Sequence, residues 1–273
     1  MENNMKKAWL FGLTTAVVVA GGIEDFKGQS GTLRIAGGTA HIPIMKIVST
    51  EISKVAPELK IAIAGGGSGV GIKKVGEGLV DIGNAGRKAS DAEIAKYGQV
   101  LHKWAIDDIA VVLNAVNPVH ALSKAQVKQI FAGEIRNWKA VGGKDAAITL
   151  YTRDKASGTR KVFWKKVLDK GDIDKKALFV KSNGAMKRSV QGDPAAIGFM
   201  SAGFVDDSIQ AVSIDGVAPS TENIQKGDYT FVRGLYSITK GEPTGATKTF
   251  IDYLLTPHVQ HDIVAKKGFI PVK

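Results

Sequence analysis

Three short turns rich in glycine and hydroxyl groups are the parts of this chain best suited to chemistry. They read GGTA at 37–40, GGGSG at 65–69 and SGT at 157–159, and Arg153 precedes the third. Each follows a predicted strand and opens a predicted helix, where free backbone N–H groups and a partial positive charge favour an anion. Glycine lets the backbone approach a ligand closely, and a hydroxyl adds a hydrogen-bond donor. Arg153 adds a planar, positively charged guanidinium that can donate two parallel hydrogen bonds to an anion. Brought together, the three turns would surround a tetrahedral oxyanion with donors.

The same turns do not fit the common nucleotide or acyl-transfer motifs. GGGSGVG at 65–71 matches G-x-G-x-x-G in no register, no Walker motif is present, and Val70 stands where G-x-S-x-G requires glycine. A phosphate-ester hydrolase with Ser68 or Ser157 as nucleophile is the alternative from another class, but neither serine has a histidine or paired carboxylates beside it. We therefore predict a binding protein and not an enzyme, with no metal and no cofactor.

An alternation of strands, glycine turns and helices must position these groups. Apolar runs predict strands, and apolar residues at helical spacing predict helices. The first half has predicted strands at 33–38, 59–64 and 80–86, with helices at 43–56 and 72–79. The second half has strands at 108–114 and 147–153, helices from Ser123 and within 154–168, and a long amphipathic helix at 247–267 that ends at Gly268. This pattern is typical of an α/β fold with a largely parallel sheet.

Charge and composition indicate which class of ligand the protein binds and in which cellular compartment it lies. There are 37 basic and 26 acidic residues, a net charge of +11, and basic residues never exceed two in a row. This distribution predicts a small anion and no nucleic acid as partner. Cysteine is absent, which excludes disulfides and thiolate metal sites. The apolar stretch 8–22 follows Lys6 and Lys7 and is too short to span a bilayer, so we predict a signal peptide at 1–22, cleavage near Ala20 and a periplasmic location.

With these turns in place, the sequence resembles the periplasmic phosphate-binding proteins of bacterial ABC importers over nearly all of residues 31–273. The resemblance rests on AGGTAHIP at 36–43, GGGSGVGIKKVGEGLVDIGNAGR at 65–87, QIFAGEIRNWKAVGG at 129–143, TRDKASGTRKVF at 152–163 and GFIPV at 268–272. It implies a type II periplasmic-binding fold, with two α/β lobes joined by two crossover strands and the ligand in the cleft between them. It also implies inorganic phosphate as ligand, an inner-membrane ABC permease and its ATPase as partners, and a monomer.

The resemblance also implies a set of anion-binding residues and a division into lobes. The residues are Thr39, Ala40, Ser68, Arg87, Arg153, Ser157, Gly158 and Thr159. Crossovers are expected near 111–116 and 231–236, so that lobe one comprises 31–112 with 235–273 and lobe two comprises 113–234. The sequence departs from the family at Gly86, where members carry serine or an aspartate that can accept the proton of hydrogen phosphate. Sulfate, molybdate and tungstate therefore stay open as ligands, and so does a sensing role without transport.

Overall fold

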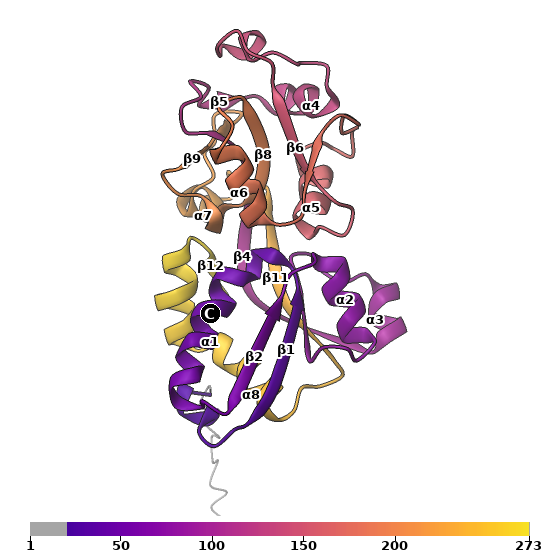
Figure 1. The fold of residues 1–273 in the computed structure, drawn as a ribbon, viewed down its shortest axis with the longest axis vertical. Helices are drawn as coiled ribbons and strands as arrows, with labels where there is room; N and C mark the ends of the chain where they lie inside the picture. Colours follow the sequence, from indigo (N-terminus) through magenta and orange to yellow (C-terminus); the bar gives the residue numbers. More distant parts are fainter. Residues whose placement is uncertain (1–20, 273) are drawn as a thin grey trace, which may run out of the picture.

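Two lobes lie one above the other along the long axis of the molecule, with a narrow waist between them (Figure 1). The computed structural model describes residues 21–272, so the predicted signal peptide lies almost wholly outside the described residues. Lobe one, at the bottom of the figure, contains β1 (Gly31–Gly37), β2 (Leu59–Ala64), β3 (Ile82–Ala85), α1 (Ile42–Val55), α2 (Ser68–Gly76), α3 (Asp91–Tyr97) and α8 (Gly245–Leu254). Lobe two contains β5 (Ala121–Leu122), β6 (Thr149–Arg153), β7 (Leu178–Val180), β8 (Ala196–Ser201), β9 (Ile209–Ala211), β10 (Ser213–Ile214), α4 (Lys124–Ala132), α5 (Gly158–Lys166), α6 (Asn183–Gln191) and α7 (Thr221–Lys226).

Two long strands connect the lobes. The strands β4 (Gln99–Asn114) and β11 (Val232–Lys240) pair antiparallel over 99–108 of β4, and β4 then pairs with β8 from Ile109 onward. Trp104 belongs to the core of lobe one, whereas Ile109 packs in the core of lobe two. The first crossover therefore lies between these residues, earlier than the expected 111–116, because the apolar side chains from Ile109 on already pack within lobe two. Phe231, just before β11, packs against the core of lobe two and Leu235 of β11 is buried in the core of lobe one, so the second crossover lies between these residues.

The sheet is mixed and not largely parallel, which corrects the prediction from the sequence. Within lobe one β1 runs parallel to β2 and β3, and within lobe two β6 runs parallel to β7 and β8. The connecting strands pair antiparallel with each other, β11 with β3 and β4 with β8. A chain that leaves lobe one along β4 and returns along β11 must run in opposite directions on the two strands.

The predicted single helix over 247–267 was wrong. α8 ends at Leu254, a π-helical turn follows at His258–Val264, and a 3-10 turn at Ala265–Lys267 leads to Gly268. Pro257 has no backbone N–H and cannot continue the helical ladder. The carbonyl of Tyr253 accepts the backbone N–H and the hydroxyl of Thr256 instead. Gly268 ends the segment in the left-handed conformation, as expected, with φ +76°.

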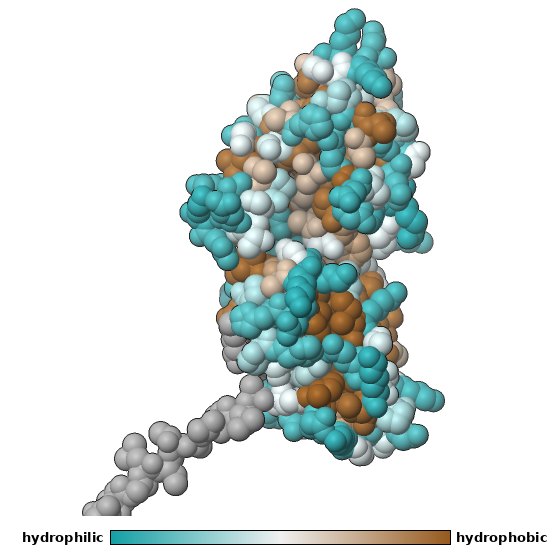
Figure 2. Space-filling view, turned by 90° about the vertical axis from the view of Figure 1, so that its left-hand side faces the viewer, coloured by the Kyte–Doolittle hydropathy of each residue, from teal (hydrophilic) through white to brown (hydrophobic). Residues whose placement is uncertain are grey.

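Each lobe has an apolar core of its own. Phe26, Trp104 and Phe250 are buried in lobe one. In lobe two, the rings of Phe163 and Phe199 stack at 4.0 Å between centroids. Figure 2 shows polar residues over most of lobe two and apolar residues gathered in patches on lobe one. Among residues 21–272, no helix has both the length and the apolar character needed to cross a membrane.

Candidate functional site

The three turns predicted from the sequence meet at the waist between the lobes. They line one small pocket, whose residues are Gly38, Thr39, Ala40, Gly67, Ser68, Gly86, Arg153, Ser157, Gly158, Thr159 and Arg233. The first two turns follow β1 and β2 in lobe one, and the third lies between β6 and α5 in lobe two. Gly67 has φ +87°, and a Cβ there would lie 2.8 Å from the carbonyl oxygen of Ala156 in the opposite lobe. Glycine at this position therefore lets the lobes touch.

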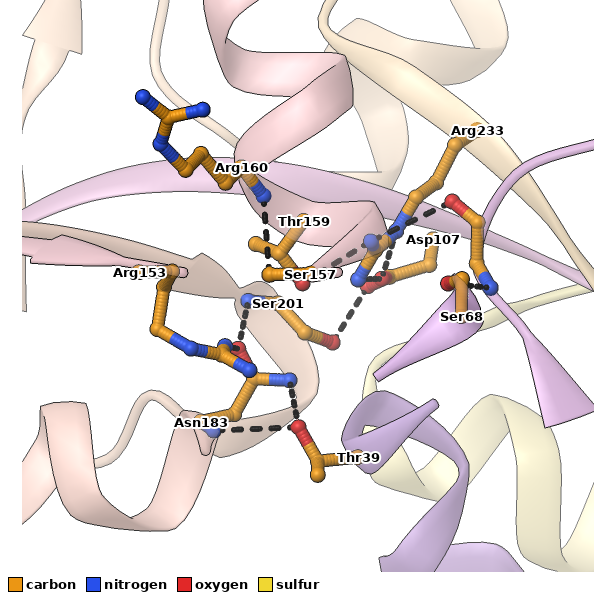
Figure 3. Close-up of polar contacts among 11 residues, drawn as sticks. Thr39, Ser68, Asp107, Arg153, Ser157, Thr159, Arg160, Asn183, Ser201 and Arg233 are labelled. Atoms are coloured by element: carbon orange, nitrogen blue, oxygen red, sulfur yellow. Dashed lines mark hydrogen bonds and ion pairs between the residues drawn. The ribbon is translucent and has the colours of Figure 1, made fainter. Parts of the chain in front are cut away.

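Hydrogen bonds across the waist hold the lobes in a closed arrangement. The backbone N–H of Gly69 donates to the Ala156 carbonyl at 3.1 Å. The backbone and side-chain N–H groups of Asn183 both donate to Thr39 Oγ1, each at 3.2 Å (Figure 3). The space left between the turns is about 10 Å³, which is close to what one water needs. The turns are therefore packed closely together in this arrangement, and two-lobed folds of this kind open and close around their ligands by hinge motion.

Four hydroxyl groups in this pocket are oriented as donors. Each oxygen accepts a protein N–H: Asn183 N to Thr39 Oγ1 (3.2 Å), Gly86 N to Ser68 Oγ (2.9 Å), Arg160 N to Ser157 Oγ (3.1 Å) and Arg233 Nη1 to Thr159 Oγ1 (3.0 Å). A hydroxyl has one hydrogen to give, and an oxygen that already accepts from the protein keeps that hydrogen for another partner. The set is therefore suited to a ligand that accepts hydrogen bonds on several sides.

Arg153 is a buried cation with only neutral partners. Its residue is 1% exposed, and its guanidinium donates to Asn183 Oδ1 at 3.3 Å and to the Lys181 carbonyl at 3.2 Å. Its Nε has no partner among the described residues. Burial lowers the pKa of Arg153 to about 10, with the charge of Arg233 adding to the effect and Asp154 opposing it. A buried charge without a counterion is costly, and an anion in the pocket would compensate it.

Arg233 is a second arginine in the pocket, and it was missed from the sequence. It comes from the connecting strand β11, and its side chain is only 3% exposed. Its Nε and Nη2 both donate to Asp107 Oδ2, at 2.8 and 2.7 Å, and Asp107 Oδ1 accepts the hydroxyl of Ser201 at 2.7 Å. Arg233 is thus fully compensated, unlike Arg153. The signal that could have found it is a charged residue inside the apolar strand predicted to cross between the lobes.

The arginine from β11 also explains why glycine stands at position 86. A Cβ on Gly86 would lie 2.7 Å from Nη1 and 2.9 Å from Cζ of Arg233. No side chain fits there while the guanidinium keeps its contacts with Asp107 and Thr159. The space beside the Gly86 backbone is thus occupied by an arginine from a different strand. As a result, no carboxylate is among the residues that line the pocket.

Arg87 lies elsewhere. Its guanidinium forms two hydrogen bonds with the carboxylate of Glu93, at 2.7 and 2.8 Å, and it lines a different pocket on the outer side of the waist. Arg87 holds the pKa of Glu93 near 2. Glu93 belongs to α3 and completes a capping box with Ser90 at the start of that helix. The sequence SDAE at 90–93 carries this signal, but α3 was not predicted.

The fold and the pocket define a two-lobed binding protein of the type II periplasmic class, which confirms the fold predicted from the sequence. Residues 27–258 match the family model described as a PBP superfamily domain. The chain is 38% identical over 254 residues to the phosphate-binding protein PstS of Bacillus subtilis, covering 91% of this chain and 84% of that protein. The chain belongs to the PBP superfamily and, within it, to the PstS phosphate-binding protein family.

Solved structures support the same assignment. A putative phosphate ABC transporter substrate-binding protein with bound phosphate from Clostridium perfringens has 35% identity and a TM-score of 0.82, covering 89% of this chain and all of that one. An ABC-type phosphate transport receptor from Vibrio cholerae has 31% identity and a TM-score of 0.65, covering 88% of this chain and 99% of that one. The relative from Bacillus subtilis is named as a phosphate-binding protein, the two solved structures are named as parts of phosphate transport systems, and none of the three is named as an enzyme.

Proposed function

We propose that this protein captures inorganic phosphate between its lobes and delivers it to an ABC permease. The observation that carries the proposal is Arg153, a buried guanidinium without a carboxylate partner, surrounded by hydroxyl groups that are free to donate. Phosphate is a tetrahedral acceptor with enough negative charge to compensate that arginine. The names of the relatives from Bacillus subtilis and Clostridium perfringens point to the same ligand.

Each lobe contributes part of the proposed phosphate shell. Lobe one supplies the Thr39 and Ser68 hydroxyls and the Ala40 N–H, and lobe two supplies Arg153 with the turn at 157–159. To these we add Arg233, which orients the Thr159 hydroxyl, and we place Arg87 outside the shell because it is paired with Glu93. A ligand that contacts both lobes binds the closed form more tightly and shifts the population toward it.

The proposed role is transport and not catalysis. Among residues 21–272, Ser68 Oγ and Ser157 Oγ form hydrogen bonds with backbone N–H groups and with no basic side chain, whereas a nucleophilic hydroxyl needs a proton acceptor. We place the protein outside the cytoplasm as a monomer that meets an inner-membrane permease and its ATPase, in keeping with the predicted signal peptide and the names of the relatives. Uptake of radiolabelled phosphate by cells with and without this chain separates transport from a sensing role.

Calorimetric titration of the purified protein tests the ligand. We expect one site for phosphate with a Kd of about 1 μM or tighter, corresponding to about −8 kcal/mol. Sulfate, molybdate and tungstate titrated under the same conditions are expected to bind more weakly. No heat with phosphate, together with clear heat for one of the other oxyanions, would overturn the phosphate assignment while leaving the anion site intact.

A further inference from the structure

A second pocket is lined by the segment that precedes α3 and by α5. These two helices lie on the same side of the molecule (Figure 1). The volume of the pocket is about 450 Å³, far larger than the space between the three turns. Lobe one, lobe two and the connecting strand all line it: Arg87, Lys88 and Ser90, then Lys161, Val162, Lys165 and Lys166, then Val232, Arg233, Gly234 and Tyr236. A volume of several hundred Å³ is in the range that small molecules occupy in proteins.

The lining of this pocket is cationic, and most of its positive charge is uncompensated. Six of the eleven lining residues are lysine or arginine, and none is acidic. Arg87 and Arg233 are paired with carboxylates, but the ion pairs among residues 21–272 include none with Lys88, Lys161 or Lys165. Lys161 and Lys165 lie one turn apart on α5, an arrangement of like charges that weakens a helix. The pocket therefore has a local excess of positive charge that a ligand could neutralise.

Lys166, the fourth lysine of this pocket, is held by a hydrogen bond to the backbone. The Lys166 ammonium donates to the Thr230 carbonyl at 2.9 Å, and burial lowers its pKa. Lys88, which follows β3, lines the pocket from lobe one, and the α5 lysines line it from lobe two. Ammonium groups act as point charges on flexible stems and do not demand the planar geometry of a single carboxylate. The arrangement suits an anion that carries several charges along its length.

We propose that this pocket is a second anion site, and that it binds a condensed phosphate of two or three phosphoryl units. A triphosphate chain carries a charge of about −4 to −5 at neutral pH, which matches the four lysines. The site is distinct from the one between the turns, because the guanidinium of Arg233 lies between them and is bound to Asp107 and Thr159. An anion that bridges the two walls would also hold the lobes at their closed separation.

Titration of tripolyphosphate into protein already saturated with orthophosphate tests this site. At about 0.15 M ionic strength, where exposed charges are screened within about 8 Å, we expect one binding event for tripolyphosphate and a weaker one for pyrophosphate. The double variant Lys161→Glu/Lys165→Glu is expected to weaken tripolyphosphate binding at least about tenfold. Its affinity for orthophosphate should stay near that of the unmodified protein. That result would show that the variant folds and that the second site can fail while the proposed phosphate site between the turns still binds.

The matched control changes the net charge equally at another place. Lys175 and Lys176 are exposed on lobe two and do not line the pocket, so Lys175→Glu/Lys176→Glu should bind tripolyphosphate nearly as the unmodified protein does. If both double variants lose tripolyphosphate affinity equally, the effect is one of overall charge and the proposed site is overturned. The proposal is also overturned if tripolyphosphate does not bind to the unmodified protein. Binding to vesicles containing phosphatidylglycerol that is lost in Lys161→Glu/Lys165→Glu, with no competition by tripolyphosphate, would assign the lysines to a lipid surface instead.

Discussion

Arg153 in lobe two and Arg233 on the connecting strand are both buried and line the same pocket, yet their surroundings differ. Arg233 donates two hydrogen bonds to Asp107, whereas Arg153 has an amide oxygen and a backbone carbonyl as partners. Removing one member of a compensated buried pair leaves an unpaired charge and destabilises the fold. Removing an uncompensated charge takes away what the ligand would neutralise. The difference separates a residue for ligand binding from one that holds the waist together.

Replacing the uncompensated arginine should have the largest effect. We expect Arg153→Ala to weaken phosphate binding about 10³-fold, or about 4 kcal/mol, because the anion loses its buried counter-charge. Calorimetric titration measures this change. Arg160→Ala is the matched control, since the Arg160 guanidinium points away from the cluster in Figure 3. A Kd for Arg153→Ala within tenfold of the unmodified value would contradict the role given to this arginine.

Removing the counter-charge of the other arginine should affect stability before binding. Asp107→Asn keeps the shape of the side chain but leaves Arg233 buried without a carboxylate, which should lower the free energy of unfolding by about 3 kcal/mol. Urea denaturation in phosphate-free buffer measures this. Asp169→Asn, which breaks an exposed pair with Lys124, should have a much smaller effect. If Asp107→Asn is as stable as the unmodified protein but loses phosphate binding, the assignment of the two arginines is reversed.

Asp108, next to the Asp107 that pairs with Arg233, is a buried carboxyl without a cationic partner within residues 21–272, and its contribution to stability should depend on pH. Burial, and then the charge of Asp107, raise the pKa of Asp108 to about 7, and Oδ2 of Asp108 has no partner among the described residues. Between pH 4 and pH 7 the folded state then binds more protons at Asp108 than the unfolded state, so its contribution to stability falls as the pH rises.

Replacing Asp108 by a neutral amide should remove this loss. We expect Asp108→Asn to match the unmodified protein near pH 4 and to exceed its unfolding free energy by about 4 kcal/mol at pH 8. Urea denaturation at pH 4, 6 and 8 gives the difference at each pH. A difference that does not change with pH would show that Asp108 keeps an ordinary pKa in the folded protein.

Single hydroxyl donors should have the smallest effect. Thr39→Val removes one hydrogen bond to the proposed anion and should raise the Kd for phosphate about tenfold, or about 1.4 kcal/mol. The control is Thr152→Val, because the Thr152 hydroxyl is buried, has no hydrogen-bond partner within residues 21–272 and does not line the pocket. Equal affinities for Thr39→Val and the unmodified protein would mean that this hydroxyl serves only the contact with Asn183.

Local signals in the sequence predicted much of this site. Each glycine and hydroxyl turn follows a strand, Arg153 is the last residue of β6, and the carboxyl ends of these strands meet at the waist. The pairing of Arg233 with Asp107 could not be predicted, because the two residues are 126 positions apart and neither belongs to a turn motif. Arg87 stands next to Gly86 in a recognisable segment, but the direction of its side chain depends on Glu93 in a helix that was not predicted.

The fold shows the same limit. Apolar periodicity predicted the elements within each lobe, but pairing partners decide sheet direction, and periodicity alone does not report them. Pro257 was a visible signal for the end of α8, and the strong apolar spacing on both sides of it concealed the break. The crossover of β4 was placed too late because nothing in the run from Gln99 to Asn114 marks where one core ends and the other begins.

A crystal structure of the phosphate complex tests the central claim most directly. We predict tetrahedral density between the lobes, with its oxygens within about 3 Å of the Arg153 guanidinium and of the Thr39, Ser68, Ser157 and Thr159 hydroxyls. Arg233 should still be paired with Asp107. Phosphate bound away from Arg153, or beside Arg87, with Arg153 still bonded only to Asn183 and Lys181, would contradict the account.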